Sequence, residues 1–375
     1  MDHSKHKAAK IELGTSAAFD AQGLLWIATR EAAGDGSTGY VVLQTSADMG
    51  KTWSAPKRVQ QIPEAVSADG ESRPKLAFGK SGQIYIAYTK PLSKPYTGDI
   101  RFSRSVDGGQ TFSAPVTVHT DHNEITHRFE SMIVDKNGRV YIAWIDKRDG
   151  EAAKARKEKY EGAATYYAVS EDSGASFKGD FKIADHTCEC CRIAMALNPQ
   201  GQPVAMWRHV FEPNIRDHAL TTLTPDGKLP PLIRTSFDDW RVDACPHHGP
   251  SIAFAADGTR HQTWFNVKGD EGGVFYAATH KDGSLGVPVK LGTAQAEHAD
   301  VAVNGQAVVL AWKQFDGKST AILGKYSADG GATWKDREFG TTQGNSDQPH
   351  LFATPSGIAM VWRTQNEGVR IISAQ

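Results

Sequence analysis

The eight residues Ser46-Ala47-Asp48-Met49-Gly50-Lys51-Thr52-Trp53 return three more times along the chain, at 105–112, 170–177 and 327–334. Each copy has a serine, an aspartate two residues later, a glycine and a final aromatic residue. The carboxylate can accept amide hydrogens of a turn, glycine tolerates a positive φ, and the aromatic ring can pack back on a sheet. The pattern therefore predicts four tight turns between strands, built on Asp48, Asp107, Asp172 and Asp329.

The distances between these turns indicate how much chain belongs to one repeat. Weaker relatives of the turn occur at 224–227 and 280–283, and the aspartates 48, 107, 172, 226, 282 and 329 are 59, 65, 54, 56 and 47 residues apart. A repeat of this length holds four short strands with their turns, which is typical of one propeller blade.

A second repeat lies between the turns and consists of two apolar strands joined by a short glycine-containing turn. Runs such as Val140-Tyr141-Ile142-Ala143-Trp144 are apolar without alternation, as expected for strands buried on both faces. Seven such hairpins occur, at 17–28, 76–88, 132–144, 196–207, 252–264, 301–312 and 351–362.

These repeats predict an all-β chain that forms a single β-propeller of four-stranded blades over residues 9–375, after a flexible tail at 1–8. Seven hairpins favour seven blades; a six-bladed ring would require one hairpin to be an insertion. The last blade lacks an outer strand of its own. We expect the segment 11–14 to complete that blade and to close the ring, which removes exposed strand edges.

On its turn repeats the chain resembles the sialidase-like propellers with Asp-box (BNR) repeats, from about Lys10 to the end. The resemblance implies the propeller fold. Sialidases of this kind use an arginine triad on the substrate carboxylate, a tyrosine nucleophile paired with a glutamate, and an acidic proton donor. Here the segment 14–19, where the first arginine should fall, reads Gly-Thr-Ser-Ala-Ala-Phe, and only Ser72-Arg73-Pro74 in the second blade is similar. No catalytic residue is transferred to this chain, and whether it is an enzyme stays open.

The charge balance excludes some partners. Lys+Arg and Asp+Glu number 42 and 43, so no basic field exists to attract nucleic acid or an anionic membrane. The sequence contains no run of about 18 apolar residues, so it predicts no transmembrane helix. We expect a monomeric protein of the periplasm or of the secreted fraction, with its signal peptide already removed.

All four cysteines lie in two unusual segments. Cys188, Cys190 and Cys191 follow His186, and Cys245 precedes His247 and His248. Thiolates beside imidazoles are the ligands of a thiophilic ion, copper(I) in the first place and zinc as an alternative. Four is also an even number, so structural disulfides without a metal remain the competing interpretation.

The order of a propeller places both segments at one end of the central channel, because they lead into the adjacent blades four and five. Weaker candidate ligands at the same end are His127, His209 and His298. His3 could chelate copper(II) together with a free terminal amine. We predict an extracytoplasmic copper-binding propeller for sequestration, delivery or redox handling, with a possible envelope protein partner left open. The alternatives are a sialidase-like glycoside hydrolase, a copper-dependent oxidoreductase, and a carbohydrate-binding or protein-interaction propeller with structural disulfides.

Extra length in the third blade comes from residues 146–164. The alanines and charges of 151–159 predict a short exposed helix, with Lys154 and Glu158 one turn apart. A solvated decoration and a lid over the cysteines are the two interpretations of this insertion.

Overall fold

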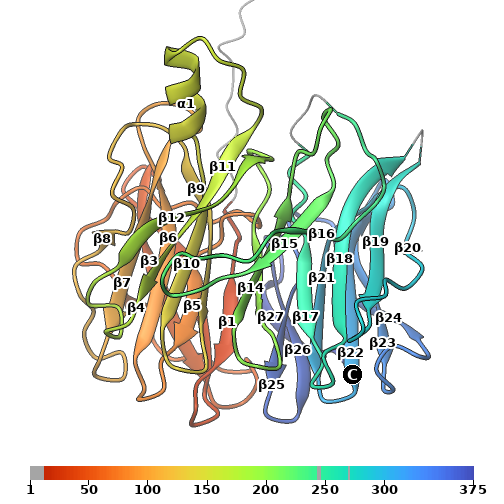
Figure 1. Cartoon of the computed structure of the whole chain (residues 1–375). Helices are drawn as coiled ribbons and strands as arrows, with labels where there is room; N and C mark the ends of the chain where they lie inside the picture. Colours follow the sequence, from red (N-terminus) through yellow and green to blue (C-terminus); the bar gives the residue numbers. More distant parts are fainter. Residues whose placement is uncertain (1–11, 243–245, 269–270) are drawn as a thin grey trace, which may run out of the picture.

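The computed structural model describes residues 12–242, 246–268 and 271–375. Seven antiparallel sheets stand side by side around a central axis, and one short helix projects from the ring (Figure 1). The fold class predicted from the repeats is confirmed: the chain is a seven-bladed β-propeller.

Each sheet is a meander in chain order. The first three blades are β1 (Ser16–Phe19), β2 (Leu25–Ala33), β3 (Thr38–Ser46) and β4 (Lys57–Arg58); β5 (Lys75–Phe78), β6 (Ile84–Pro91), β7 (Gly98–Ser105) and β8 (Val116–Thr117); and β9 (His127–Val134), β10 (Val140–Asp146), β11 (Ala163–Ser170) and β12 (Lys178–Thr187). The other four are β13 (Ala194–Leu197), β14 (Pro203–Arg208), β15 (His218–Thr222) and β16 (Ile233–Arg234); β17 (Ser251–Phe254), β18 (Arg260–Lys268), β19 (Glu271–Thr279) and β20 (Val289–Leu291); β21 (Ala296–Asn304), β22 (Ala307–Phe315), β23 (Thr320–Ser327) and β24 (Lys335–Thr342); and β25 (His350–Thr354), β26 (Gly357–Thr364) and β27 (Gly368–Ser373).

The two innermost strands of every blade are the predicted apolar hairpins. In blade three, β10 pairs with β9 and is buried along its whole length. Trp144 of β10 and Trp362 of β26 have no exposed surface. These strands show no alternation because neighbouring blades cover both faces of each sheet.

The last blade has three strands within the described residues. Ile11, the first residue of the strand expected to complete it, lies outside those residues, as does the predicted tail at 1–8. Residues 12–14 follow without strand pairing. Thr15 N donates to Asp347 Oδ2 at 3.0 Å, which ties the start of blade one to the segment before β25.

The four predicted turns share one hydrogen-bond pattern. Ser105 Oγ donates to Asp107 Oδ1 at 2.7 Å and accepts from Gly109 N at 2.8 Å. Thr111 closes the turn with its amide at 2.9 Å from Asp107 Oδ1 and its hydroxyl at 2.6 Å from Oδ2. The turns around Asp48, Asp172 and Asp329 repeat these contacts.

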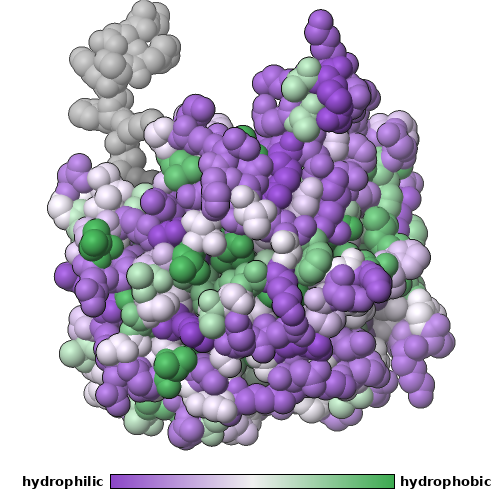
Figure 2. All heavy atoms as spheres, turned by 60° about the vertical axis from the view of Figure 1, so that its left-hand side comes forward, coloured by the Kyte–Doolittle hydropathy of each residue, from purple (hydrophilic) through white to green (hydrophobic). Residues whose placement is uncertain are grey.

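The insertion of blade three forms α1 (Arg148–Ala155) between β10 and β11. The prediction of a helix over 151–159 was wrong at both ends: α1 begins earlier, and Lys157 has a left-handed φ of 59° that a continuing helix cannot contain. Lys154 consequently faces Glu151, at 3.9 Å, rather than Glu158. In Figure 2 the projecting top of the molecule is largely hydrophilic, as expected for an exposed helix.

Within the described residues, no helix is long and apolar enough to cross a membrane.

The serine of the turns makes a testable contribution to stability. In Ser105→Ala, the buried amide of Gly109 loses its acceptor, so we expect the free energy of unfolding to fall by about 1–3 kcal/mol. Urea denaturation followed by tryptophan fluorescence measures the change. The control is Ser284→Ala, which removes a hydroxyl from an exposed turn on Asp282 and should stay within about 0.5 kcal/mol of the wild type. Equal losses in the two variants would contradict a special role for the repeated turn.

Candidate metal centre and channel mouth

Three cysteines occupy the loop that leads from β12 into β13 of blade four. Cys188, Cys190 and Cys191 are each at most 3% exposed. They belong to the apolar core between blades three and four, which also contains Phe129 and Trp207. Cys188 N donates to Arg208 O at 2.9 Å, so β14 fixes the start of the loop.

The three sulfur atoms form a compact triangle. Their separations are 3.6 Å for Cys188 and Cys191, 3.8 Å for Cys188 and Cys190, and 4.0 Å for Cys190 and Cys191. A disulfide would require about 2.05 Å, and all three thiols are free. Sulfurs that share one ion at about 2.3 Å lie roughly 3.7–4.0 Å apart in tetrahedral or trigonal geometry. The triangle therefore has the dimensions of a trithiolate metal site.

The triangle favours negative charge at one sulfur. Hydrogen bonds from Cys190 and Cys191, together with the Arg208 guanidinium, hold the pKa of Cys188 well below its usual value. The hydrogen bonds to Cys188 and burial raise the pKa values of Cys190 and Cys191. Arg208 has no exposed surface, and its Nε atom has no hydrogen-bond partner within the described residues. A buried cation next to the sulfurs suits an anionic metal–thiolate cluster.

Cys245 lies outside the described residues, but the segments beside it meet the cysteine loop. The Arg208 side chain donates to His248 O at 3.1 Å and lies over the Trp240 ring. Glu71 Oε2 accepts from both Arg192 N, at 2.9 Å, and Gly249 N, at 3.1 Å. The loops that lead into blades four and five are thus neighbours, as the propeller order predicted.

The histidines are placed differently from the sulfurs. No histidine nitrogen of the described residues lies with all three sulfurs in a group within 4.8 Å. His186 Nδ1 is 3.1 Å from Glu161 O, and His247 is exposed. The other candidates lie as follows: His209 accepts from Trp207 Nε1, His127 stacks on His119 beside Asp99, His248 adjoins His298, and His3 lies outside the described residues.

Loops of several blades converge on the central axis at one end of the ring. We call the residues at this end the channel mouth, and they surround the carboxylate of Glu71. Glu71 Oε1 accepts from Arg192 Nη1 at 2.7 Å and from Gln348 Nε2 at 3.0 Å, and it lies 3.4 Å from His298 Nδ1. Burial alone would raise the pKa of Glu71, but Arg192 and His298 outweigh it and lower the pKa strongly. Burial and the neighbouring His298 lower the pKa of His248 to about 3, so that imidazole is neutral.

Below the mouth, the inner strands enclose a cavity of about 250 Å³. Its lining includes Arg73, Lys75, Arg192, Asp300 and His350. Burial lowers the pKa of Lys75 to about 8. The sequence interpretation missed Glu71, Lys75 and Asp300. Glu71 and Lys75 lie just before and at the start of β5, which was the available signal, whereas Asp300 lies within β21 at its register shift.

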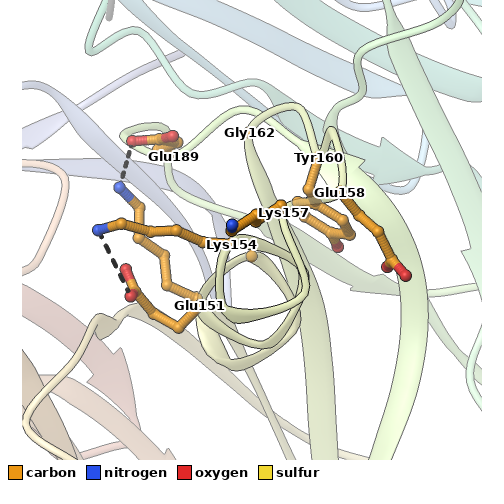
Figure 3. Close-up of a pocket in the computed structure, with 9 residues that line it drawn as sticks. Glu151, Lys154, Lys157, Glu158, Tyr160, Gly162 and Glu189 are labelled. Carbon is orange, nitrogen blue, oxygen red and sulfur yellow. Dashed lines mark ion pairs between the residues drawn. The ribbon is translucent and has the colours of Figure 1, made fainter.

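The α1 insertion is connected to the cysteine loop. Lys147 Nζ lies 2.6 Å from Glu189 Oε2, and Glu189 stands between Cys188 and Cys190. The dashed line at Glu189 in Figure 3 marks this ion pair, at the edge of an open pocket of about 490 Å³ that is lined mainly by α1 and residues 157–162. The insertion therefore lies beside the cysteine loop, as the lid interpretation requires.

Comparisons with known proteins show the fold. No family model and no curated protein matches the chain. Similar solved structures are the polysaccharide lyase Uly1 (TM-score 0.60, 8% identity, 99% of this chain and 92% of that chain), a PL25 ulvan lyase bound to -[GlcA(1-4)Rha3S]- (0.54, 10%, 94% and 90%) and the NanB sialidase of Streptococcus pneumoniae (0.51, 10%, 81% and 65%). At these identities the likeness supports a sialidase-like propeller fold and no activity.

Removing the charge of Glu71 should weaken the whole ring. In Glu71→Gln, the partly buried Arg192 keeps its charge without its counter-ion, so we expect a loss of about 3 kcal/mol, the low end for a buried pair, in the free energy of unfolding at pH 7. Because the folded pKa of Glu71 is lowered, the wild-type advantage is present above the unfolded pKa of about 4.3 and shrinks as the pH falls below it.

Urea denaturation of both proteins between pH 3 and pH 7 measures this difference. The matched control is Glu158→Gln, which removes an exposed partner of Arg156 and should leave stability unchanged. A constant difference between wild type and Glu71→Gln at all pH values would contradict the charge argument.

Proposed function

We propose that this propeller binds a thiophilic metal ion, copper(I) in the first place, through Cys188, Cys190 and Cys191. The observation that supports the proposal is the triangle of buried free thiols with separations of 3.6–4.0 Å. Structural cysteines without a ligand have no need to converge on one point.

Copper(I) is favoured over zinc by the ligand count. Copper(I) is soft and accepts two or three sulfur ligands, whereas structural zinc is almost always four-coordinate. Cys245 is the candidate fourth sulfur. A set of four thiolates would suit zinc as well. Whether Cys245 contributes a fourth sulfur therefore decides between copper(I) and zinc. Sequestration or delivery of copper in an extracytoplasmic compartment is the role that this site suits.

A copper(I) chelator competition tests the proposal. Cys188→Ser, Cys190→Ser and Cys191→Ser should each weaken copper(I) binding at least tenfold, because serine oxygen is a hard and poor substitute for sulfur. Changes at His247 or His248 should cost less. The proposal for Cys245 is that Cys245→Ser also weakens binding.

Two controls complete this experiment. Circular dichroism checks that each variant is folded, and a chain that lacks residues 1–8 removes His3. Equal affinity in the wild type and all four cysteine variants would rule out the thiolate site. Loss of all binding in the shortened chain would transfer the site to the tail.

The second candidate is an acidic saccharide in the channel cavity, and it is the function that the fold neighbours favour. Two of them are polysaccharide lyases, one with a glucuronate-containing ligand, and one is a sialidase. In this chain Lys75 lines the cavity, and the residues described show no ion pair or hydrogen bond of its ammonium group. Glu130 and Glu71 attract this charge without a direct ion pair, and a cation placed in this way in a narrow cavity favours a carboxylate or sulfate group.

Binding and turnover of a fluorogenic sialoside and of a glucuronate polysaccharide test this candidate. Lys75→Met should lose at least tenfold in affinity, and wild-type binding should weaken as the pH rises through about 8, where Lys75 loses its charge. Lys281→Met, at an exposed turn, is the control. Cysteine variants with unchanged saccharide binding would separate this function from the metal site. Saccharide binding that is equal in Lys75→Met and wild type would refute the role of Lys75.

A further inference from the structure

We propose a second metal site at the channel mouth, formed by His248, Glu297 and His298, that takes a divalent transition ion of borderline softness such as Co²⁺, Ni²⁺, Cu²⁺ or Zn²⁺. One ligand atom from each of the three side chains lies within 4.8 Å of the others. Two imidazoles and one carboxylate form a ligand set that such ions prefer and that leaves coordination positions open.

The backbone around the site aims these side chains away from the regular sheet. Strand β21 has a register shift between Glu297 and Asp300, and His298 within it adopts a left-handed φ of 51°. A bulge redirects side chains that would otherwise alternate between the two faces, and left-handed backbone is costly outside glycine. The strand thereby presents both Glu297 and His298 to the mouth.

Neighbouring groups orient the ligands. Glu71 Oε1 lies 3.4 Å from His298 Nδ1, which leaves Nε2 of the same ring 3.8 Å from Glu297 Oε2. Lys313 Nζ lies 3.7 Å from the other oxygen, Glu297 Oε1. A carboxylate behind a ligating imidazole is the usual outer arrangement of a histidine–metal site.

His248 completes the site from blade five. Its ring packs against Phe265 at 4.0 Å between centroids and against His298 at 4.5 Å. Its Nδ1 atom is buried and has no hydrogen-bond partner within the described residues. A buried nitrogen without a partner is costly, and an ion would satisfy it.

This site is separate in composition from the trithiolate triangle and does not rest on it. The sulfurs form a group of their own, and the nitrogens and Glu297 form another. The two groups should also differ in preference, because soft copper(I) selects sulfur and borderline divalent ions accept imidazole and carboxylate.

Cobalt(II) titration of the untagged chain tests the second site, because cobalt(II) reports its ligands. Thiolate ligation gives a sulfur-to-cobalt charge-transfer band in the near ultraviolet, whereas nitrogen and oxygen ligation gives visible d–d bands alone. With Cys188, Cys190 and Cys191 all changed to serine, we expect the charge-transfer band to be absent and the d–d bands to remain.

On that background, His248→Ala and Glu297→Gln should each weaken cobalt(II) binding at least tenfold. The matched controls are His280→Ala and Glu338→Gln, at exposed positions, which should leave binding unchanged. Unchanged affinity in His248→Ala and Glu297→Gln would overturn the proposal, whatever the copper(I) result.

If the triple cysteine change prevents folding, Glu297→Gln in the otherwise natural chain gives the same decision. In a cobalt(II) titration, this variant should lose the part of the d–d absorbance that rises without a matching rise of the charge-transfer band. Persistence of that part would overturn the proposal. Glu297 is partly exposed, with 36% of its side-chain surface accessible, so this variant should keep the fold.

Discussion

The channel mouth depends on the contacts that the carboxylate of Glu71 makes with its neighbours. A buried charge is tolerated only when several donors surround it, and here the donors come from different blades: Arg192, Gly249 and Gln348, with His298 beside them. Arg192 also donates to Ala299 O, at 3.1 Å. Rotating one blade relative to its neighbours would leave at least one of these groups unpaired. The orientation of the blades around the axis is therefore fixed by the contacts of a buried charge as well as by apolar packing.

Other carboxylates at the same end of the ring also accept hydrogen bonds from neighbouring blades. Asp300 of blade six accepts from Ser251 Oγ of blade five and from Leu351 N of blade seven. Asp347 accepts from Thr15 N, where blade one begins, and lies 3.3 Å from Arg73. Desolvated acids that accept from the adjacent blade resist sliding, since each would lose its partner. Side chains at the mouth are consequently held in place by the fold itself, and such preorganisation would favour binding of a ligand there.

How much of this the sequence predicted depends on whether the signal is local. The turns on Asp48, Asp107, Asp172 and Asp329 and the seven hairpins are short-range patterns, so the blade number followed from counting them. The sulfur triangle is also local, because Cys188, Cys190 and Cys191 share one loop. The contacts of Glu71 are not local, since its partners lie more than a hundred residues away in sequence. Glu297 escaped notice because a bulge decides its direction. The end of α1 depends on the left-handed Lys157, which composition does not reveal.

The ion pair between Glu71 and Arg192 connects the two proposed metal sites. Arg192 follows Cys191 directly, and Glu71 faces His298 Nδ1, so one ion pair stands between the sulfur loop and the imidazole pair. An ion on the sulfurs that draws the loop inward would displace Arg192 and lengthen its contact with Glu71. That carboxylate would then lie nearer to His298 alone and strengthen the imidazole as a ligand. If both proposed sites bind an ion, occupation of the sulfurs and occupation of the imidazoles would be coupled through this buried carboxylate, and by linkage the coupling would be the same in both directions.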